Sequence, residues 1–562
     1  MTQSNSRRQF IRYFSAGTVA VSTISLTACG GGSDPSYQPI SFAHGVASGD
    51  PLSDRVILWT RITAAAGADD MDVGWTVAED SEFTKVVASG TARAGAAADY
   101  TVKVDATGLS PNRGYYYRFR CQGVTSPVGR TKTLPTGAVT RARFAVFSCS
   151  NYPTGYFNVY GDAAKFDDID VGLHLGDYIY EYAASGYASQ TAAALNRVSQ
   201  PANEIITLTD YRRRYQQYRT DPDLQAVHAR IPFIAVWDDH ELSNDTWREG
   251  AENHNPLTEG LWAARRMMAI QAYHEWMPIR QPDAARPDRI YRSFDFGNLL
   301  SLHMLDTRVI GRDKQLAMAS YVNADKSFNA AAFTADVSNP TRQLMGAEQT
   351  TWLQNQMSKS TATWQVLGQQ VLMARMLLPA PMVLGTVGYP TYFGIAAKVK
   401  AGVALTATEQ QQLDAPKVPY NLDAWDGYAA ARETVLTMAK TLNKNLVVLA
   451  GDTHNAWASD LADVNGQAVG VEFGVPSVTS PGFETYFPTF APAVVAGGME
   501  QLIGPLQYAD TSLRGFVVLT VTPTETRAEY RYVDTIQSKT YTASVGKTLR
   551  MLPGSANRKL VG

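Results

Sequence analysis

The sequence predicts an α/β protein in which two sheets pack face to face with helices outside them, preceded by a small all-β domain. Two observations predict this fold. Between residues 40 and 135, short β-branched and aromatic runs alternate with turn residues, which is typical of an immunoglobulin-like or fibronectin-like sandwich. From about residue 140, apolar strand patterns alternate with segments whose apolar residues have helical spacing.

Length and composition agree with a two-domain globular protein. The chain has 562 residues, more than one hydrophobic core usually serves. Apolar residues make up 45% and charged residues 18%, which is ordinary for a folded protein. The formal net charge is −2, and the sequence has neither a zinc finger nor a Lys/Arg stripe, so we expect no nucleic-acid-binding domain.

The first 28 residues have the features of an export signal. Arg7 and Arg8 precede an uncharged run from residue 13 to residue 28, which predicts a twin-arginine signal peptide over residues 1–28. The ending Leu26-Thr27-Ala28-Cys29 resembles the lipobox of bacterial lipoproteins, which would place a lipid anchor on Cys29. The alternative is a plain cleaved signal. We therefore expect a periplasmic protein or a membrane-anchored lipoprotein on the extracellular face.

The predicted N-terminal domain covers residues 40–135. Its expected strands lie at 56–60, 73–77, 86–88, 100–104 and 115–119. The segment 135–137 is a plausible hinge to the next domain.

The predicted catalytic domain covers residues 140–540. Its expected strands lie at 144–147, 171–175, 233–237, 299–305 and 446–450. Expected helices lie at 261–276, 343–357 and 425–442. Two later strands, 515–521 and 527–532, are expected to complete the second sheet. The uncharged run 376–397 is long enough to span a bilayer, but its prolines and glycines favour a surface loop.

Polar clusters follow the strands of the predicted catalytic domain. Carboxyl ends of strands in an α/β fold border one crevice, so these side chains should meet there. Several carboxylates in one crevice repel each other unless a cation neutralises them. Only eight histidines occur, and oxygen donors dominate, which favours Ca²⁺, Mg²⁺ or Fe³⁺ over zinc. The clusters are Ser148-Cys149, Gly176-Asp177, Asp238-Asp239-His240-Glu241, Asp306-Thr307-Arg308 and Gly451-Asp452-Thr453-His454.

These motifs resemble the metallophosphoesterases, and closely the PhoD-type alkaline phosphatases among them. The run Gly176-Asp177-Tyr178-Ile179-Tyr180-Glu181 belongs to the resemblance, as do residues 44–51 and 425–428. Cys149 stands where the superfamily has Asp-x-His, the usual Gly-Asn-His-Glu reads Asp238-Asp239-His240-Glu241, and Asp452 changes the closing Gly-His-x-His. All three departures follow the PhoD-type pattern. The resemblance implies the αββα metallophosphoesterase sandwich.

The resemblance also implies a metal centre with one Fe³⁺ and one or two Ca²⁺. Asp177 would bridge the two kinds of metal. Asn244 would be a ligand of calcium or a contact of phosphate. The implied iron ligands are Cys149, Asp177, Tyr180 and His454, and the implied calcium ligands are Asp177, Asp239, Asp452 and Asn244. The alternative for the Cys149 thiol is a disulfide with Cys121, because an exported protein can form disulfides.

The implied activity is hydrolysis of phosphate esters by a metal-bound hydroxide. His240 would hydrogen-bond a phosphoryl oxygen or protonate the leaving group, and Arg308 would contact phosphate. The substrate is a monoester or diester. One alternative is a phospholipase D-like phosphodiesterase acting on phospholipids, and another is a lipid-anchored binding protein with a structural metal. Sequence does not indicate the oligomeric state.

Other residues allow two interpretations. Tyr389, Tyr392 and Phe393 could line the substrate entrance or simply pack, and Glu472 could orient a ligand or pair locally. The remaining histidines are expected to be structural. They are His44, His174, His228, His254, His274 and His303.

Overall fold

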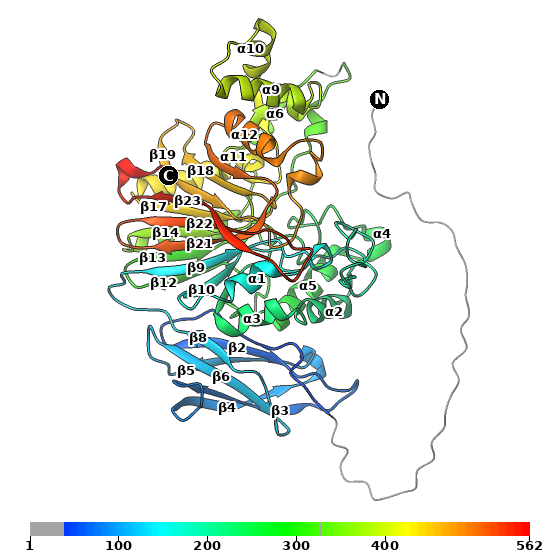
Figure 1. Cartoon of the computed structure of the whole chain (residues 1–562), viewed down its shortest axis with the longest axis vertical. Coiled ribbons are helices and arrows are strands. Elements are labelled where there is room, and N and C mark those ends of the chain that lie inside the picture. The colour runs from blue at the N-terminus through cyan, green and yellow to red at the C-terminus, as the bar shows by residue number, and fades with distance from the viewer. Residues whose placement is uncertain (1–38, 326) are drawn as a thin grey trace, which may run out of the picture. The chain divides into compact units, whose positions relative to one another are not determined.

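The computed structural model describes residues 39–325 and 327–562, and residues 40–562 form one compact unit (Figure 1). The predicted signal peptide and Cys29 lie outside the described residues. Within the described ranges, we found no helix with both the length and the apolar character needed to cross a membrane.

The larger sheet contains three parallel strands that lead to the candidate site. Leu173 in the middle strand pairs with Val146 on one side and Ile234 on the other. The strand order is β23 (Ala543–Met551), β22 (Thr526–Val533), β21 (Arg514–Val521), β9 (Ala142–Phe147), β10 (Val171–His174), β11 (Phe233–Ala235), β1 (Val46–Gly49), β2 (Arg55–Arg61) and β5 (Thr101–Thr107).

Strands β21 and β22 correct one expectation from the sequence. They were expected in the second sheet, but β21 pairs antiparallel with β9, with Val517 opposite Val146. They therefore extend the larger sheet on the side of β9 (Figure 1). The apolar pattern of β21 shows a buried strand but does not reveal which buried strand it pairs with.

The smaller sheet also has parallel strands at its centre. Strands β13, β14, β17 and β19 run in one direction. The order is β12 (Arg292–Phe296), β13 (Leu300–Met304), β14 (Trp364–Gly368), β17 (Asn445–Ala450), β19 (Ala468–Gly474), β18 (Ala456–Ala462) and β20 (Leu506–Asp510).

The two sheets pack against each other through a shared core, as predicted. The rings of Phe144 in β9 and Phe296 in β12 lie 5.0 Å apart. In β17, Val447 and Leu449 belong to this core, whereas Leu446 and Val448 belong to the core under the outer helices. Alternate residues of one strand thus serve two cores, because successive side chains point to opposite faces. The predicted α/β two-sheet sandwich is confirmed.

Helices cover the outer faces of both sheets. On the larger sheet they are α1 (Asn158–Ala163), α2 (Leu208–Tyr218), α3 (Pro222–Arg230) and α5 (Trp262–Trp276). On the smaller sheet they are α7 (Gly346–Lys359), α11 (Ala429–Thr441) and α12 (Pro492–Leu502). Shorter peripheral helices are α4 (Pro256–Glu259), α6 (Ala330–Val337) and α10 (Ala407–Leu413).

The N-terminal segment is a β-sandwich whose one layer continues the larger sheet. Strand β1 pairs with β2 and also meets β11, with Gly49 opposite Phe233. Trp59 Nε1 donates to the Glu275 carbonyl at 2.8 Å and Lys103 donates to that of His274, so both cap the C-terminal end of α5. The second layer contains β4 (Val86–Ala94), β3 (Met71–Ala78), β6 (Gly114–Cys121), β7 (Val124–Thr125) and β8 (Gly129–Lys132).

The prediction of a surface loop over residues 376–397 is wrong. The segment forms β15 (Leu377–Pro379), paired with β16 (Lys417–Pro419), and then α8 (Ala380–Val383) and α9 (Tyr389–Lys400). Pro390 lies in the first turn of α9, where a missing backbone N–H costs nothing. Tyr392 and Phe393 are buried, and the Phe393 ring meets Phe490 at 5.4 Å, so both residues pack.

Candidate metal centre

The polar clusters after β9, β10, β11, β13 and β17 meet at one edge of the sandwich. Strands β9, β10 and β11 are mutually parallel, so Cys149, Asp177 and Asp239 all follow carboxyl ends. Asp452 and His454 follow β17 of the other sheet. The structure therefore brings side chains from both sheets into one site, as the sequence predicts for a crevice of this kind.

Four of the predicted ligands have an unusual backbone conformation. Cys149, Asp177, Asp452 and His454 have φ values of 63°, 56°, 65° and 63°. A positive φ is unfavourable for residues other than glycine and costs about 1–3 kcal/mol for each residue. Residues with this strained backbone are found most often at functional sites. The fold thus holds these four side chains in conformations that the free chain would avoid.

The predicted iron ligands lie together. Ligand atoms of Cys149, Asp177 and His454 lie within 4.8 Å of one another. The Tyr180 hydroxyl donates to Asp177 Oδ2 at 3.0 Å and lies 3.1 Å from His454 Nε2. Ser480 Oγ donates to the same hydroxyl at 2.6 Å. A thiol, a carboxylate, a phenol and an imidazole therefore share one small volume.

His454 has the orientation that a metal ligand needs. Its Nδ1 lies 3.0 Å from the Pro481 carbonyl, so a proton on Nδ1 is donated there and Nε2 is left to face Asp177 Oδ2 at 3.9 Å. Burial, followed by the charge of His240, lowers the pKa of His454 to about 3. The imidazole is therefore neutral at ordinary pH, which is the form that binds metals.

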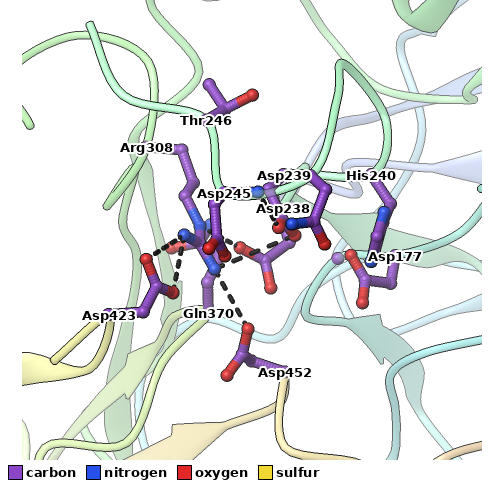
Figure 2. Close-up of polar contacts among 12 residues, drawn as sticks. Asp177, Asp238, Asp239, His240, Asp245, Thr246, Arg308, Gln370, Asp423 and Asp452 are labelled. Carbon is purple, nitrogen blue, oxygen red and sulfur yellow. Dashed lines mark hydrogen bonds and ion pairs between the residues drawn. The ribbon is translucent and has the colours of Figure 1, made fainter. Parts of the chain in front are cut away.

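The predicted calcium ligands Asp177, Asp239 and Asp452 lie in two groups that share Asp239. Asp177, Asp239 and His240 make one, and Asp238, Asp239 and Asp452 make the other (Figure 2). Asp177 Oδ1 and Asp239 Oδ1 are buried and have no hydrogen-bond partner. Buried carboxylate oxygens normally have a partner, so these two atoms fit a cation between them.

The protonation of these groups also fits a bound cation. Burial raises the pKa of Asp177 to about 7 and that of Asp452 well above its usual value. Burial, followed by the charge of Asp177, likewise raises the pKa of the Cys149 thiol. Burial raises the pKa of Asp239 too, but Arg308 and His240 outweigh it and lower that pKa. Hard cations would favour the deprotonated form of all these donors.

Arg308 lies among the carboxylates of the site. Its guanidinium is fully buried and faces carboxylates on every side (Figure 2). Nε donates to Asp238 at 2.5 Å, Nη1 to Asp423 at 2.9 Å and Nη2 to Asp452 at 3.0 Å. Three of its five N–H donors are thus engaged with carboxylates, and the predicted phosphate contact, which would use the remaining donors, stays a prediction.

Asn244 already has partners for its side chain. Its Oδ1 accepts from the Tyr182 hydroxyl at 3.0 Å, and its Nδ2 donates to Glu252 at 2.7 Å. A role as calcium ligand or phosphate contact would replace these bonds, and it stays a prediction.

Two fully buried glutamates position the site, and the sequence interpretation assigned them no role. Glu241 accepts from the backbone N–H groups of Asp177, Tyr178 and Asp238 at 3.0, 2.5 and 2.8 Å, which ties two strand-end loops together. Glu181 lies 2.7 Å from His240 Nδ1 and also accepts from the Asn244 backbone at 2.8 Å. Glu181 is the last residue of the motif 176–181, and Glu241 is the last residue of the motif 238–241. Their positions in these motifs were the signal in the sequence that could have indicated a role in the site.

The cysteine alternative is resolved. Cys121 and Cys149 are both free thiols, so the alternative prediction of a disulfide between them is wrong. Cys121 belongs to the core of the N-terminal sandwich, and Cys149 lies beside Ser148, whose Oγ is 2.8 Å from its Sγ.

Other ambiguous residues have local partners. Glu472 accepts from the backbone N–H groups of Met373 and Ala374 at 2.6 and 2.9 Å, so it holds a loop rather than a ligand. His174 forms a hydrogen bond with Tyr160, and His303 forms hydrogen bonds with Ser293 and Gln365. These two histidines therefore have structural partners, as expected.

Comparisons with known proteins agree with this geometry. Residues 144–530 match the family described as PhoD-like phosphatase, and residues 28–135 match the PhoD-like phosphatase N-terminal domain. Alkaline phosphatase D of Bacillus subtilis (strain 168) is 37% identical over 548 residues, which is 93% of this chain and 84% of that protein. A solved structure of PhoD superimposes with a TM-score of 0.75 at 35% identity, covering 95% of this chain and 94% of the other.

Proposed function

The chain belongs to the PhoD-like phosphatase family and is a phosphoric ester hydrolase, and on that premise we propose that it is an exported alkaline phosphatase that also cleaves phosphodiesters at an Fe³⁺ and Ca²⁺ centre. One observation carries the metal proposal. A free thiol, a phenol and a neutral imidazole surround Asp177, whose Oδ1 is buried without a partner. Thiolate and phenolate together suit a trivalent iron.

The residues present divide between the two kinds of cation. Cys149, Tyr180 and His454 would hold iron, while Asp239 and Asp452 supply the hard oxygen donors that suit calcium. Asp177 lies close to Cys149 and His454 and also to Asp239, so it would be shared between the two kinds of cation. Bound cations supply a nucleophile by lowering the pKa of water, and they offset the charge of the phosphoryl oxygens.

His240 would act on the leaving group. Glu181 accepts the proton on Nδ1, which orients the ring and leaves Nε2 available to the substrate. The ring is also held against Tyr180, with centroids 4.2 Å apart. A proton on Nε2 could thus be given to the departing oxygen or shared with a phosphoryl oxygen without reorientation of the ring.

Export is proposed from the sequence alone. Arg7 and Arg8, the uncharged run and the ending at Cys29 support a twin-arginine signal with a lipid anchor. The mass of the N-terminal peptide of the mature protein tests this proposal. A lipid on Cys29 is expected, and a peptide that begins elsewhere without lipid contradicts the anchor.

Three esters test the proposed activity: para-nitrophenyl phosphate, bis-para-nitrophenyl phosphate and phosphatidylcholine. Release of nitrophenol from the first two is expected, and Asp177→Ala should abolish it. Turnover of the lipid alone would favour a phospholipase D-like enzyme. No turnover of any ester, with metal still bound, would favour a binding protein with a structural metal.

A further inference from the structure

Two tyrosines that belong to no predicted ligand set lie over the candidate metal centre. Tyr182 and Tyr187 are half-buried, and their ring centroids are 5.5 Å apart. The Tyr182 ring lies 5.3 Å from the ring of His240, and the Tyr187 hydroxyl lies 3.2 Å from His454 Nδ1. The two rings therefore stand next to the groups that would meet a substrate.

The setting of these rings differs from that of packing tyrosines. Tyr178 and Tyr215 nearby are covered completely, whereas Tyr182 and Tyr187 keep part of their surface open. Aromatic surface is thus left partly uncovered beside His240 and His454.

A hydrogen bond orients the Tyr182 ring, and a ring stack orients the Tyr187 ring. The Tyr182 hydroxyl donates to Asn244 Oδ1 at 3.0 Å, and Tyr187 is stacked on Tyr180 with an interplanar angle of 20°. A ring that is already held in place loses little entropy when a ligand packs on it. Tyrosine rings also have a flat apolar face that favours offset stacking with another planar ring.

We propose that Tyr182 and Tyr187 are specificity-determining residues that stack a planar aromatic ring in the alcohol part of the ester. The inference rests on the proposed phosphatase function and names its substrate class: nucleotides and aryl phosphates are preferred to phosphate esters of sugars or simple alcohols.

A matched pair of substrates tests this preference. Adenosine 5′-monophosphate and ribose 5-phosphate release the same kind of primary alkoxide, and they differ in the planar base. Because base–aromatic stacking gives about a tenfold gain or more, kcat/KM of the wild-type holoenzyme should be about tenfold higher for the nucleotide. The ratio of the two kcat/KM values is the measured quantity.

Variants assign the preference to the two rings. Tyr182→Leu and Tyr187→Leu should bring the ratio toward one while ribose 5-phosphate is still hydrolysed. Tyr182→Phe and Tyr187→Phe keep the rings and should keep the ratio, even if a leucine variant folds poorly. Tyr541→Leu is the control, since this half-buried ring lies over Lys165, outside the site, and should leave the ratio unchanged.

The outcomes separate this inference from the function on which it rests. Equal kcat/KM for the two substrates in the wild type, with para-nitrophenyl phosphate still hydrolysed, overturns only the stacking role. An unchanged ratio in both leucine variants overturns it as well. Loss of turnover on every ester in the wild-type protein overturns the proposed function and the inference together.

Discussion

Replacement of Arg308 by methionine tests how the site balances its buried charges. Methionine has a similar length and no charge, so Arg308→Met leaves Asp238 and Asp452 without their guanidinium partner, while Asp423 keeps Arg312. Breaking a buried ion pair by removing one partner costs about 3–5 kcal/mol. We expect a loss of that size in the free energy of unfolding of the metal-free protein.

Calcium should reduce this loss. Asp239 and Asp452 face Arg308 and are also the proposed calcium ligands, so a bound cation offsets the charge that the variant leaves unmatched. Urea unfolding followed by tryptophan fluorescence, with chelator and then with calcium, measures both values. Arg286→Met, at an exposed position, is the control and should change stability by less than about 0.5 kcal/mol.

The competing account treats Arg308 as a phosphate contact. In that case Arg308→Met would raise KM and leave stability within about 1 kcal/mol of wild type. That result would refute the assignment of Arg308 as the cation that balances the buried carboxylates.

Three further predictions concern the two buried glutamates of the site and the buried histidine His274. Glu241→Gln weakens the clamp on the Asp177 and Asp238 backbones, so metal affinity measured by chelator competition should fall by about 10–100-fold, and an unchanged affinity would count against the clamp. Glu181→Gln replaces the anionic acceptor of His240 Nδ1 by a neutral amide, so kcat should fall by about 10–100-fold with metal content unchanged, whereas loss of metal would show a different role. Burial, followed by the charge of Lys103, lowers the pKa of His274 to about 3, so the native state binds fewer protons than the unfolded state between pH 6.5 and pH 3, and stability falls as pH falls through that window. Relative to His274→Gln, the wild type should therefore lose about 1.4 kcal/mol of unfolding free energy between pH 7.5 and pH 5.5, and parallel pH profiles would contradict the neutral buried histidine.

Local patterns in the sequence predicted the strands and the polar residues after them. The run 446–450 is apolar throughout and became β17, and the residues directly after it, Asp452 and His454, reached the site. Such predictions succeed because the carboxyl ends of parallel strands share an edge, whatever the rest of the chain does.

The errors arose where long-range pairing or burial decided the outcome. The partner of β21 is β9, more than 300 residues earlier in the chain, and no local pattern reports such a pairing. The prolines of residues 376–397 signalled breaks, yet they begin helices. Arg308 follows a strand like the candidate ligands, and its burial among carboxylates became visible only in the structure.

The metal content and absorption spectrum of the purified protein test the central proposal most directly. We expect about one iron per chain together with calcium, and a coloured protein, because thiolate and phenolate both bind Fe³⁺. Cys149→Ser and Tyr180→Phe should each shift or abolish the visible band. A colourless wild-type protein that contains zinc alone would contradict the proposed centre.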